Sequence, residues 1–361
     1  MPKKSISSLE LMALVHELQF LVQGKLTHIY HPQEKELLFQ IHVPNQGKQL
    51  LKIIPGKWLC LTQRKDITVK PSSFCMQLRK YIDNASIKSL MQKDSERIII
   101  FELEKEKKFF IIIELFSKGN VILTDEHNSI IGVLEQQVWK DRAVKPGQKY
   151  VFPPIDVHWK ELTPQQLFEI LHQSQKRNVA TALATDIGLG GVYAEELCAR
   201  AGISKDLLPR EVALLDARKL MQSFQEMLRV VQAPQGYVYA EQVTPFLLQG
   251  AAPLKIMETY NEAIDALIPF TITSPYEKKI KALEMTIASQ EESLREFHHN
   301  AAENTHRAEL IYEKYAPLQK LLDIVKELKK TKNWQEIAAE LKKEKKIKEV
   351  NLKEKKIVID L

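Results

Sequence analysis

The sequence predicts an α+β protein in which a β-rich N-terminal domain is followed by helical segments and the start of a small α/β domain. Short apolar runs separated by polar turns recur through residues 1–160, as in antiparallel sheets. The apolar spacing becomes helical from Thr163 to about Val231, and apolar residues then repeat in heptads from Tyr276 to Tyr315. We therefore expect domains at 1–160, 161–272, 273–316 and 317–361.

The composition is that of a soluble globular protein, with 44% hydrophobic and 27% charged residues. A net charge of +6 is compatible with nucleic-acid binding but does not indicate it. The sequence has no run of 18 apolar residues, so we expect no membrane span. Glu10 and His16 interrupt the apolar start and no cleavage site follows, which argues against a signal peptide. Three scattered cysteines fit neither a disulfide framework nor a zinc site, and a cytoplasmic protein is predicted.

Two helices and a series of strands are predicted in the N-terminal domain. Ser8 is a candidate cap for a helix over Leu9–Val22. A second helix follows Pro71 and carries Arg79 and Lys80 towards its C-terminal end, where cations suit the helix dipole. The strand-like runs are KLTHIYHP, ELLFQIHV, QLLKIIPG, KWLCLT, SIKSLMQK, RIIIFELE, FFIIIELF, NVILTD and SIIGVLEQQVW. Short strands with polar turns predict a barrel or sandwich with both helices packed on it.

A glycine-dense stretch, Asp186–Ile203, lies between two helical patterns and predicts a helix-hairpin-helix. Gly188 and Gly190 permit positive φ, so the turn can offer backbone amides to a phosphate. The alternative is a plain helical hairpin whose glycines only make the turn. On this reading Glu195 and Glu196 fall in the first turn of the next helix, where they would repel a phosphate. We interpret the hairpin mainly as a packing and surface-presenting element, with its glycines kept as candidate RNA contacts.

The heptad pattern predicts one long helix with an apolar seam. The seam positions are Tyr276, Ile280, Leu283, Ile287, Gln290, Leu294, Phe297, Ala301, Asn304, Ala308, Ile311 and Tyr315. The pattern does not identify what covers this seam. A packed amphipathic helix and a coiled-coil dimer of this fragment both satisfy it, and a returning helix would have to follow the end of the sequence.

Two further segments carry strand patterns. Residues 236–250 return to strand character, and we expect them to rejoin the first sheet. After the heptads, two short helices and a strand pair are predicted, with KIKEV and KIVIDL on either side of NLKEK. Because a fold rarely ends on a hydrophobic strand, we expect the chain to be a fragment of a longer one.

The sequence argues for a binding protein without a catalytic residue or a cofactor. Its ten histidines are dispersed, and the glycine motifs of hydrolases, nucleotide-binding loops and dinucleotide folds are absent. Two charged positions are more informative. Glu10 lies in the first turn of the first helix, and Glu96-Arg97 precedes the strand IIIFELE. Arginine makes bidentate contacts to phosphates and bases, and a carboxylate accepts from base amino groups. Structural explanations are the alternatives to RNA binding. On these, Glu10 only suits the positive end of the helix dipole, and Glu96-Arg97 is an exposed ion pair that contributes little.

Several stretches, taken together, resemble the NFACT family, which includes RqcH and NEMF. They are SSLELMALVHEL, PSSFCMQLRKYI, SERIIIFELE, ELFSKGNVILTDE, VWKDRAVKPGQKYVFPP and GLGGVYAEELCARAGI, followed by the heptad helix. The resemblance is collinear over nearly the whole chain and is closest to archaeal members. It implies a β-rich domain like the N-terminal domain of formamidopyrimidine-DNA glycosylases, a helix-hairpin-helix domain, and a coiled coil with a small middle domain.

The resemblance also implies a function. Members bind a large ribosomal subunit that still carries a stalled peptidyl-tRNA, recruit tRNA, and support template-free tailing of the nascent chain. The tail marks that chain for degradation, which places a ubiquitin-ligase or protease pathway downstream. Together with the residues singled out above, the candidate tRNA- or RNA-binding set is Glu10, Arg79, Lys80, Glu96, Arg97, Gly188 and Gly190.

Two departures from the family pattern bear on this expectation. Glu10 and Glu96 stand where the family usually has Asp, and the family's tail synthesis depends on these positions and on the paired arginine. The extra methylene lengthens the reach of a site that is sensitive to such displacements, so tailing competence is open. Asp141-Arg142 matches another family element, which we interpret as a structural turn. The family's downstream RNA-binding domain and returning coil helix are absent from this sequence.

Two rival functions are considered. A DNA glycosylase would use an N-terminal proline, and the chain begins Met1-Pro2, but Lys3 stands where an acid should follow and no zinc finger is present. A cell-surface adhesin is an older label for some bacterial relatives, and the missing export signal counts against it.

Overall fold

The computed structural model describes residues 5–33, 35–64, 71–139, 142–154, 157–266, 275–341, 347–351 and 356–359. The chain divides into two units, Met1–Thr271 and Ile272–Leu361. No helix among the described residues is long and apolar enough to cross a membrane. In the first unit, the sheet and the helices after it share one hydrophobic core, and the predicted division at residue 160 stays a prediction.

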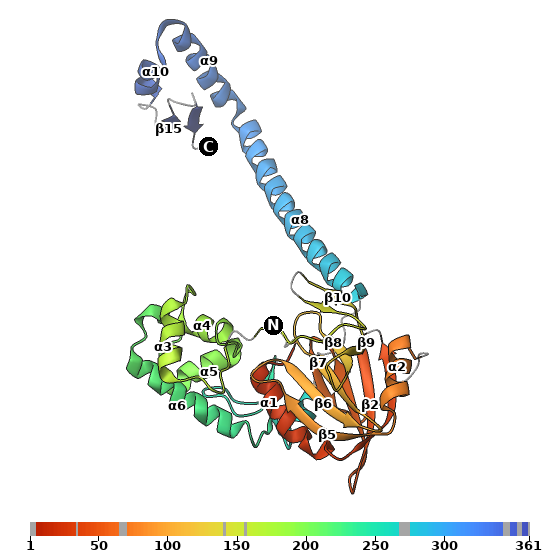
Figure 1. Ribbon diagram of the computed structural model, residues 1–361. Coiled ribbons are helices and arrows are strands. Elements are labelled where there is room, and N and C mark those ends of the chain that lie inside the picture. Colours follow the sequence, from red (N-terminus) through yellow and green to blue (C-terminus); the bar gives the residue numbers. More distant parts are fainter. Residues whose placement is uncertain are drawn as a thin grey trace. The chain divides into compact units, whose positions relative to one another are not determined.

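The first unit is built on a nine-stranded antiparallel sheet (Figure 1). Its strands are β1 (Lys25–Gln33), β2 (Glu36–Val43), β3 (Gly47–Ile54), β4 (Trp58–Leu61), β5 (Ala85–Gln92), β6 (Ile98–Glu104), β7 (Lys108–Glu114), β8 (Asn120–Asp125) and β9 (Ile130–Val133). Their order is β4-β3-β2-β1-β5-β6-β7-β8-β9. This sheet confirms the predicted mixed fold with a large antiparallel N-terminal part.

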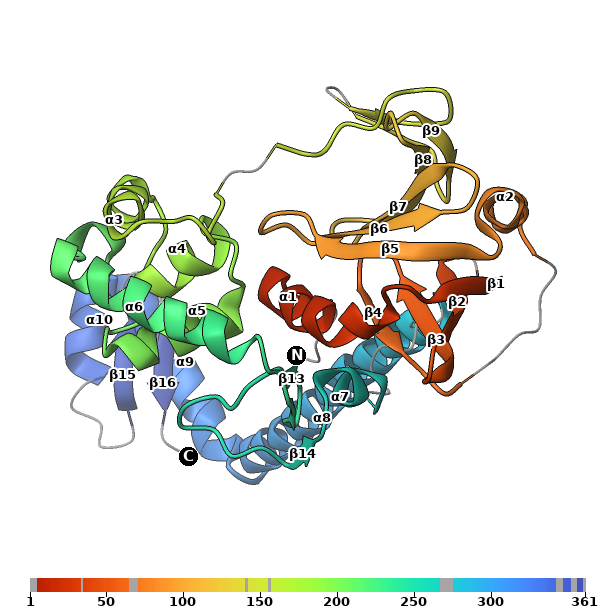
Figure 2. The same cartoon turned by 60° about the horizontal axis from the view of Figure 1, so that its bottom comes forward.

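The sheet folds over on itself between β1 and β5, which pair only at Lys25 with Ser86 and at Leu26 with Ala85. Strands β5–β9 therefore lie above β1–β4 in Figure 2. Apolar side chains from both halves, Phe39 among them, face one another across a common core. The alternating apolar pattern of these strands is what lets one face of each half be buried.

Helix α1 (Ser8–Glu17) begins one residue earlier than the sequence predicts. Its cap is Ser7 and not Ser8, because Ser7 and Glu10 form the reciprocal hydrogen bonds of a capping box. The helix also ends before the predicted Val22, and the chain continues as a 3₁₀ turn over Leu18–Leu21.

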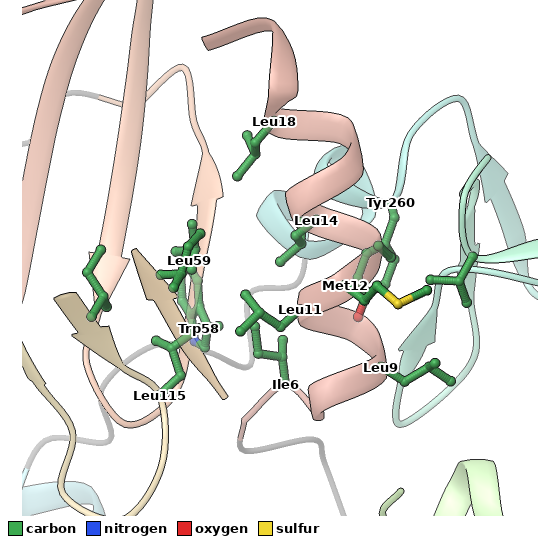
Figure 3. Close-up of a cluster of buried hydrophobic side chains, with 14 of the residues drawn as sticks. Ile6, Leu9, Leu11, Met12, Leu14, Leu18, Trp58, Leu59, Leu115 and Tyr260 are labelled. Atoms are coloured by element: carbon green, nitrogen blue, oxygen red, sulfur yellow. The ribbon is translucent and has the colours of Figure 1, made fainter. Parts of the chain in front are cut away.

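Both sides of α1 are buried, and Figure 3 shows why this helix is central to the fold. Leu11 points towards Leu59 on β4, while Met12 lies beside Tyr260 on the opposite side. Tyr260 begins α7 (Tyr260–Ala266). The helix is therefore held between the sheet and the later part of the chain, which fixes the position of its N-terminus.

The helical part of the first unit comprises α3 (Pro164–Gln173), α4 (Val179–Thr185), α5 (Gly191–Ala201), the 3₁₀ turn η2 (Pro209–Glu211) and α6 (Leu214–Val230). Helices α4 and α5 pack together and are joined by the glycine turn, residues 186–190. Two helices joined by a short glycine turn were expected here, whereas their identity as a helix-hairpin-helix motif stays a prediction.

Residues 236–250 do not rejoin the first sheet as predicted. Within the described chain, β12 (Gly236–Val238) pairs with β13 (Val243–Thr244) and with β14 (Lys255–Met257) in a separate sheet. The physical reason lies at β4, an edge of the large sheet. There Leu61 donates its N–H to the Asn261 side chain at 2.7 Å, so α7 covers the edge that a returning strand would need.

The second unit contains α8 (Pro275–Glu313), α9 (Tyr315–Thr331), α10 (Trp334–Leu341) and the antiparallel pair β15 (Ile347–Asn351) and β16 (Lys356–Ile359). The predicted helices and strand pair are therefore present. Their small core includes Ile337 and Leu341, both buried, with Trp334 packed against it.

The heptad residues lie along α8, which is 39 residues long. The side chains of Tyr276 and Ile280 lie outside the described part. Exposed seam residues include Leu283, Leu294 and Phe297, the last at 70%. The structure thus shows the long helix, with exposed apolar side chains at these described seam positions, and coiled-coil pairing stays a prediction.

Candidate functional site

A cavity of about 550 Å³ lies where three segments of the first unit meet. These segments are the N-terminus of α1, the turn at residues 93–97 before β6, and the glycine turn before α5. The cavity is lined by most of the candidate residues, namely Glu10, Glu96, Arg97, Gly188 and Gly190. Tertiary structure therefore gathers groups that are far apart in the sequence. Among the described residues, no cluster of His, Cys, Asp and Glu side chains is arranged as metal ligands.

Glu10 lies at the wall of this cavity and is only 1% exposed. The N–H of Ser7 donates to Glu10 Oε2 at 2.7 Å, and the Tyr193 hydroxyl of α5 donates to Oε1 at 2.5 Å. Burial and the neighbouring Glu10 charge raise the pKa of Tyr193 well above its usual range, and they do the same for Tyr260. Both phenols therefore stay protonated near neutral pH. One carboxylate thus ties α1 to α5.

The turn at 93–97 is anchored to α1 by Gln92, at the end of β5. Its side-chain amide donates to the carbonyl oxygens of Ser8 and Glu96, each at 2.9 Å. The Ser8 hydroxyl in turn donates to the carbonyl of Ser95. Sequence reasoning missed Gln92, since a polar residue at a strand end carries no signature of such a contact, and it considered Ser8 only as a helix cap. These bonds hold Glu96 and the following arginine beside the N-terminus of α1.

Arg97 is half-buried in the cavity wall. Its guanidinium makes no hydrogen bond or ion pair to any residue that the structure describes, although Glu96 and Glu10 are close enough to act on it electrostatically. Burial lowers the pKa of Arg97, and the two carboxylates oppose this shift. An arginine remains protonated under these conditions. The cavity therefore holds a partly desolvated cation whose donors are available to a ligand.

The glycine turn forms the third side of the cavity. Gly188 and Gly190 have φ of 81° and 78°, in the left-handed region that favours glycine. Helix α5 starts at Gly191 without a side-chain cap, and its first residues line the cavity. The unpaired N–H groups of a helix start favour a negatively charged ligand.

The predicted repulsion from Glu195 and Glu196 is not supported by the structure. Because α5 begins at Gly191, no acidic residue lies in its first turn. Glu196 pairs with Arg200 at 2.6 Å and Glu195 with Lys205 at 2.9 Å, so a cation offsets each carboxylate. The premise that acids occupy the first turn of this helix was therefore wrong, and the interpretation of the hairpin as a packing element stays a prediction.

Replacing Gly188 or Gly190 by alanine is expected to lower the free energy of unfolding by about 1–2 kcal/mol, because an alanine at this φ is strained. Gly191→Ala is the matched control, since Gly191 has no positive φ and a Cβ there meets open space. Urea unfolding of the three variants checks this prediction. Equal losses in all three would contradict it.

Arg79 and Lys80 do not line the cavity. They lie on α2 (Ser73–Ile82), which packs on β1 and β9. Arg79 donates from Nε and Nη2 to the Ile29 carbonyl at 2.9 and 2.6 Å, so its guanidinium serves the packing of α2 on the sheet. Lys80 lies 5.7 Å from the ring centroid of Tyr81.

Arg142 has a structural role, in line with its interpretation as part of a turn. Asp141, the other residue of that pair, lies outside the described residues. The Arg142 guanidinium pairs with buried Glu114 and donates from Nε to the Val151 carbonyl at 2.8 Å. The Tyr150 hydroxyl donates to the same carboxylate at 2.7 Å. This arginine anchors the segment that leaves the sheet.

The family model for NFACT N-terminal and middle domains matches residues 7–358. The chain belongs to the NFACT family. Similar curated NFACT proteins include the archaeal Rqc2 homolog aRqcH of Methanocaldococcus jannaschii, 29% identical over 93% of this chain and 54% of that protein. Ribosome quality control complex subunit 2 of Saccharomyces cerevisiae is 32% identical over 41% of this chain and 14% of its own length. The chain thus spans about half the length of the archaeal relative.

Two solved structures share the fold over nearly three quarters of this chain. The fibrinogen-binding protein of Staphylococcus aureus matches with a TM-score of 0.60 and 20% identity, over 73% of this chain and 98% of that one. The N-terminal part of the fibronectin/fibrinogen-binding protein of Streptococcus suis matches with a TM-score of 0.58 and 23% identity, over 72% and 98%. At these identities the likeness concerns the fold alone.

Proposed function

We propose that this NFACT chain acts in ribosome-associated quality control, by binding the large ribosomal subunit with its stalled peptidyl-tRNA and recruiting a further tRNA. The observation that carries the proposal is the cavity in which Glu10, Glu96 and Arg97 face a glycine turn and a helix start. Relatives named as ribosome quality control subunits support the setting. We propose a cytoplasmic binding role without a catalytic group, ahead of a ubiquitin-ligase or protease pathway.

The charges of the cavity suit an RNA loop better than a plain anion. Arg97 can donate two parallel hydrogen bonds to a phosphate or to the edge of a guanine. Glu96, beside it, can accept from a base amino group, which an isolated phosphate does not offer. The amides at the start of α5 add a place for a phosphate in the same cavity.

Glu10 has a different part in this proposal. Its carboxylate is engaged by Ser7 and Tyr193, so it positions the wall of the cavity and acts on Arg97 through its charge. Template-free tailing further requires that Glu10 take over the role of the aspartate that the family usually has at this position. Glu10 contacts Ser7 before α1 and Tyr193 on α5, and we propose that the position of α5 leaves room for the longer side chain.

The proposal is tested by sedimentation of tagged full-length protein after induced ribosome stalling, with sequencing of the co-purified tRNA. We expect the protein in the large-subunit fraction together with a restricted set of tRNAs. Its absence from that fraction after stalling would contradict the proposed function.

A further inference from the structure

An exposed tryptophan marks a second surface near the cavity. Trp139 follows the short strand β10 (Gln137–Val138) and is 45% exposed, whereas Trp58 and Trp159 are almost fully buried. Val151 nearby in the fold is 60% exposed. A large aromatic side chain left in solvent forgoes burial of its apolar surface, so its exposure points to a contact with another molecule.

Trp139 is held at its backbone, and a cation lies beside its ring. The backbone N–H of Trp139 donates to the Arg142 carbonyl at 2.7 Å, and the Arg142 guanidinium lies 5.5 Å from the tryptophan ring centroid. Arg142 is itself fixed by buried Glu114. One side of the indole therefore has a cation that is itself fixed, which limits the positions open to the ring and lowers the conformational entropy lost on binding.

Cations lie beside Trp139 and along the segment that connects it with the cavity. Arg142 is paired with buried Glu114, and Lys93 with Asp94. Lys145 lies on the same segment, is exposed, and forms no ion pair with a described residue. An aromatic ring with an arginine and a lysine beside it is typical of surfaces that bind single-stranded nucleic acid, whereas an apolar protein surface would need no such charge.

The surface is continuous with the candidate site. Lys93 lies 5.4 Å from the ring centroid of Phe152, which follows Val151, and the same lysine opens the turn that carries Arg97. One extended strand of RNA can therefore reach both places.

We propose that the exposed face of Trp139 stacks on an unpaired nucleobase of the same RNA that Arg97 contacts. This inference rests on the proposed function, since it takes the ligand of the cavity to be RNA. It adds a stacking contact outside the cavity and assigns it to one residue.

Tryptophan fluorescence tests the stacking by comparison of the wild type with Trp139→Phe, because Trp159 lines the cavity and Trp334 is half-buried, so both can also respond to bound RNA. Titration of the protein with tRNA is expected to quench part of the emission, and Trp139→Phe is expected to reduce that quenching. Binding of tRNA with unchanged emission, or equal quenching in the Trp139→Phe protein, would overturn the inference.

Affinity measurements by fluorescence anisotropy of labelled tRNA give a second test. Trp139→Ala is expected to weaken binding about tenfold, and Trp139→Phe to recover part of the loss, because phenylalanine still stacks. Val138→Ala is the matched control, since Val138 is 71% exposed in the same hairpin. An unchanged melting temperature shows that the variants are folded.

The outcomes separate this inference from the proposed function. If the wild-type protein does not bind tRNA, the proposed function fails and this inference fails with it. If Arg97→Ala weakens binding but Trp139→Ala does not, only the stacking contact is overturned. The same holds if Trp139→Ala binds tRNA normally but loses association with a protein.

Discussion

Replacing Arg97 by alanine is expected to weaken tRNA binding by about 10- to 100-fold, the range for a lost bidentate contact. The guanidinium lies half-buried in the cavity wall and has no hydrogen-bonded partner among the described residues, so its donors are available to the ligand. Because it is not committed to packing, its removal should change the melting temperature little. Fluorescence anisotropy with labelled tRNA measures the affinity.

Two further variants sharpen the Arg97 test. Arg97→Lys keeps the charge but lacks the planar fork of donors, and we expect it to recover only a small part of the affinity. Lys80→Ala removes one exposed cation on α2, outside the cavity, and should leave binding nearly unchanged. If Lys80→Ala weakened binding as much as Arg97→Ala, general attraction by positive charge would explain the data and the assigned role would be wrong.

Replacing Glu10 by alanine is expected to lower the free energy of unfolding by about 2–4 kcal/mol. The change removes one of the two hydrogen bonds of the α1 capping box, Ser7 N–H to Glu10 Oε2, and leaves the buried Tyr193 hydroxyl without its acceptor, while the Ser7 cap on the residue-10 N–H stays. A buried donor left without an acceptor costs about 1–3 kcal/mol. Glu10→Gln keeps an acceptor and should lose less. Chemical unfolding monitored by circular dichroism provides the measurement.

A double-mutant cycle with Tyr193→Phe isolates the bond between α1 and α5. In the Tyr193→Phe background no hydroxyl is left unsatisfied, so Glu10→Ala should cost less there than in the wild type. Strict additivity of the two substitutions would contradict the hydrogen bond that we see between these helices.

The sequence predicts the elements of this fold better than their partners. Strand and helix patterns identified the large sheet and the C-terminal helices and strand pair, since they depend on local periodicity. Residues 236–250 were assigned to the wrong sheet because Asn261, distant in the sequence, covers the edge at Leu61. The motif Ser7-x-x-Glu10 was present as a signal for the cap, yet the adjacent Ser8 was chosen.

For the candidate site as well, the sequence identified individual residues but not how they are arranged. Glu10 and Glu96-Arg97 could be selected from residue chemistry and family resemblance, but nothing local placed them in one cavity with Gly188 and Gly190. Helix α5 starts at Gly191, one residue earlier than expected from the sequence, so Glu195 lies outside the first turn of the helix. Arg79 was selected as a cation near a helix end, and such a residue cannot be distinguished from one that bonds a strand carbonyl until the tertiary contact is known.

The central claim is that the cavity around Arg97 holds tRNA on the large ribosomal subunit. Its most direct test is the amount of tRNA recovered per large subunit with tagged wild-type protein and with Arg97→Ala after induced stalling. The proposal predicts that Arg97→Ala remains in the large-subunit fraction while the co-purified tRNA falls several-fold. Equal loss of subunit and tRNA, or unchanged recovery of both, would contradict it.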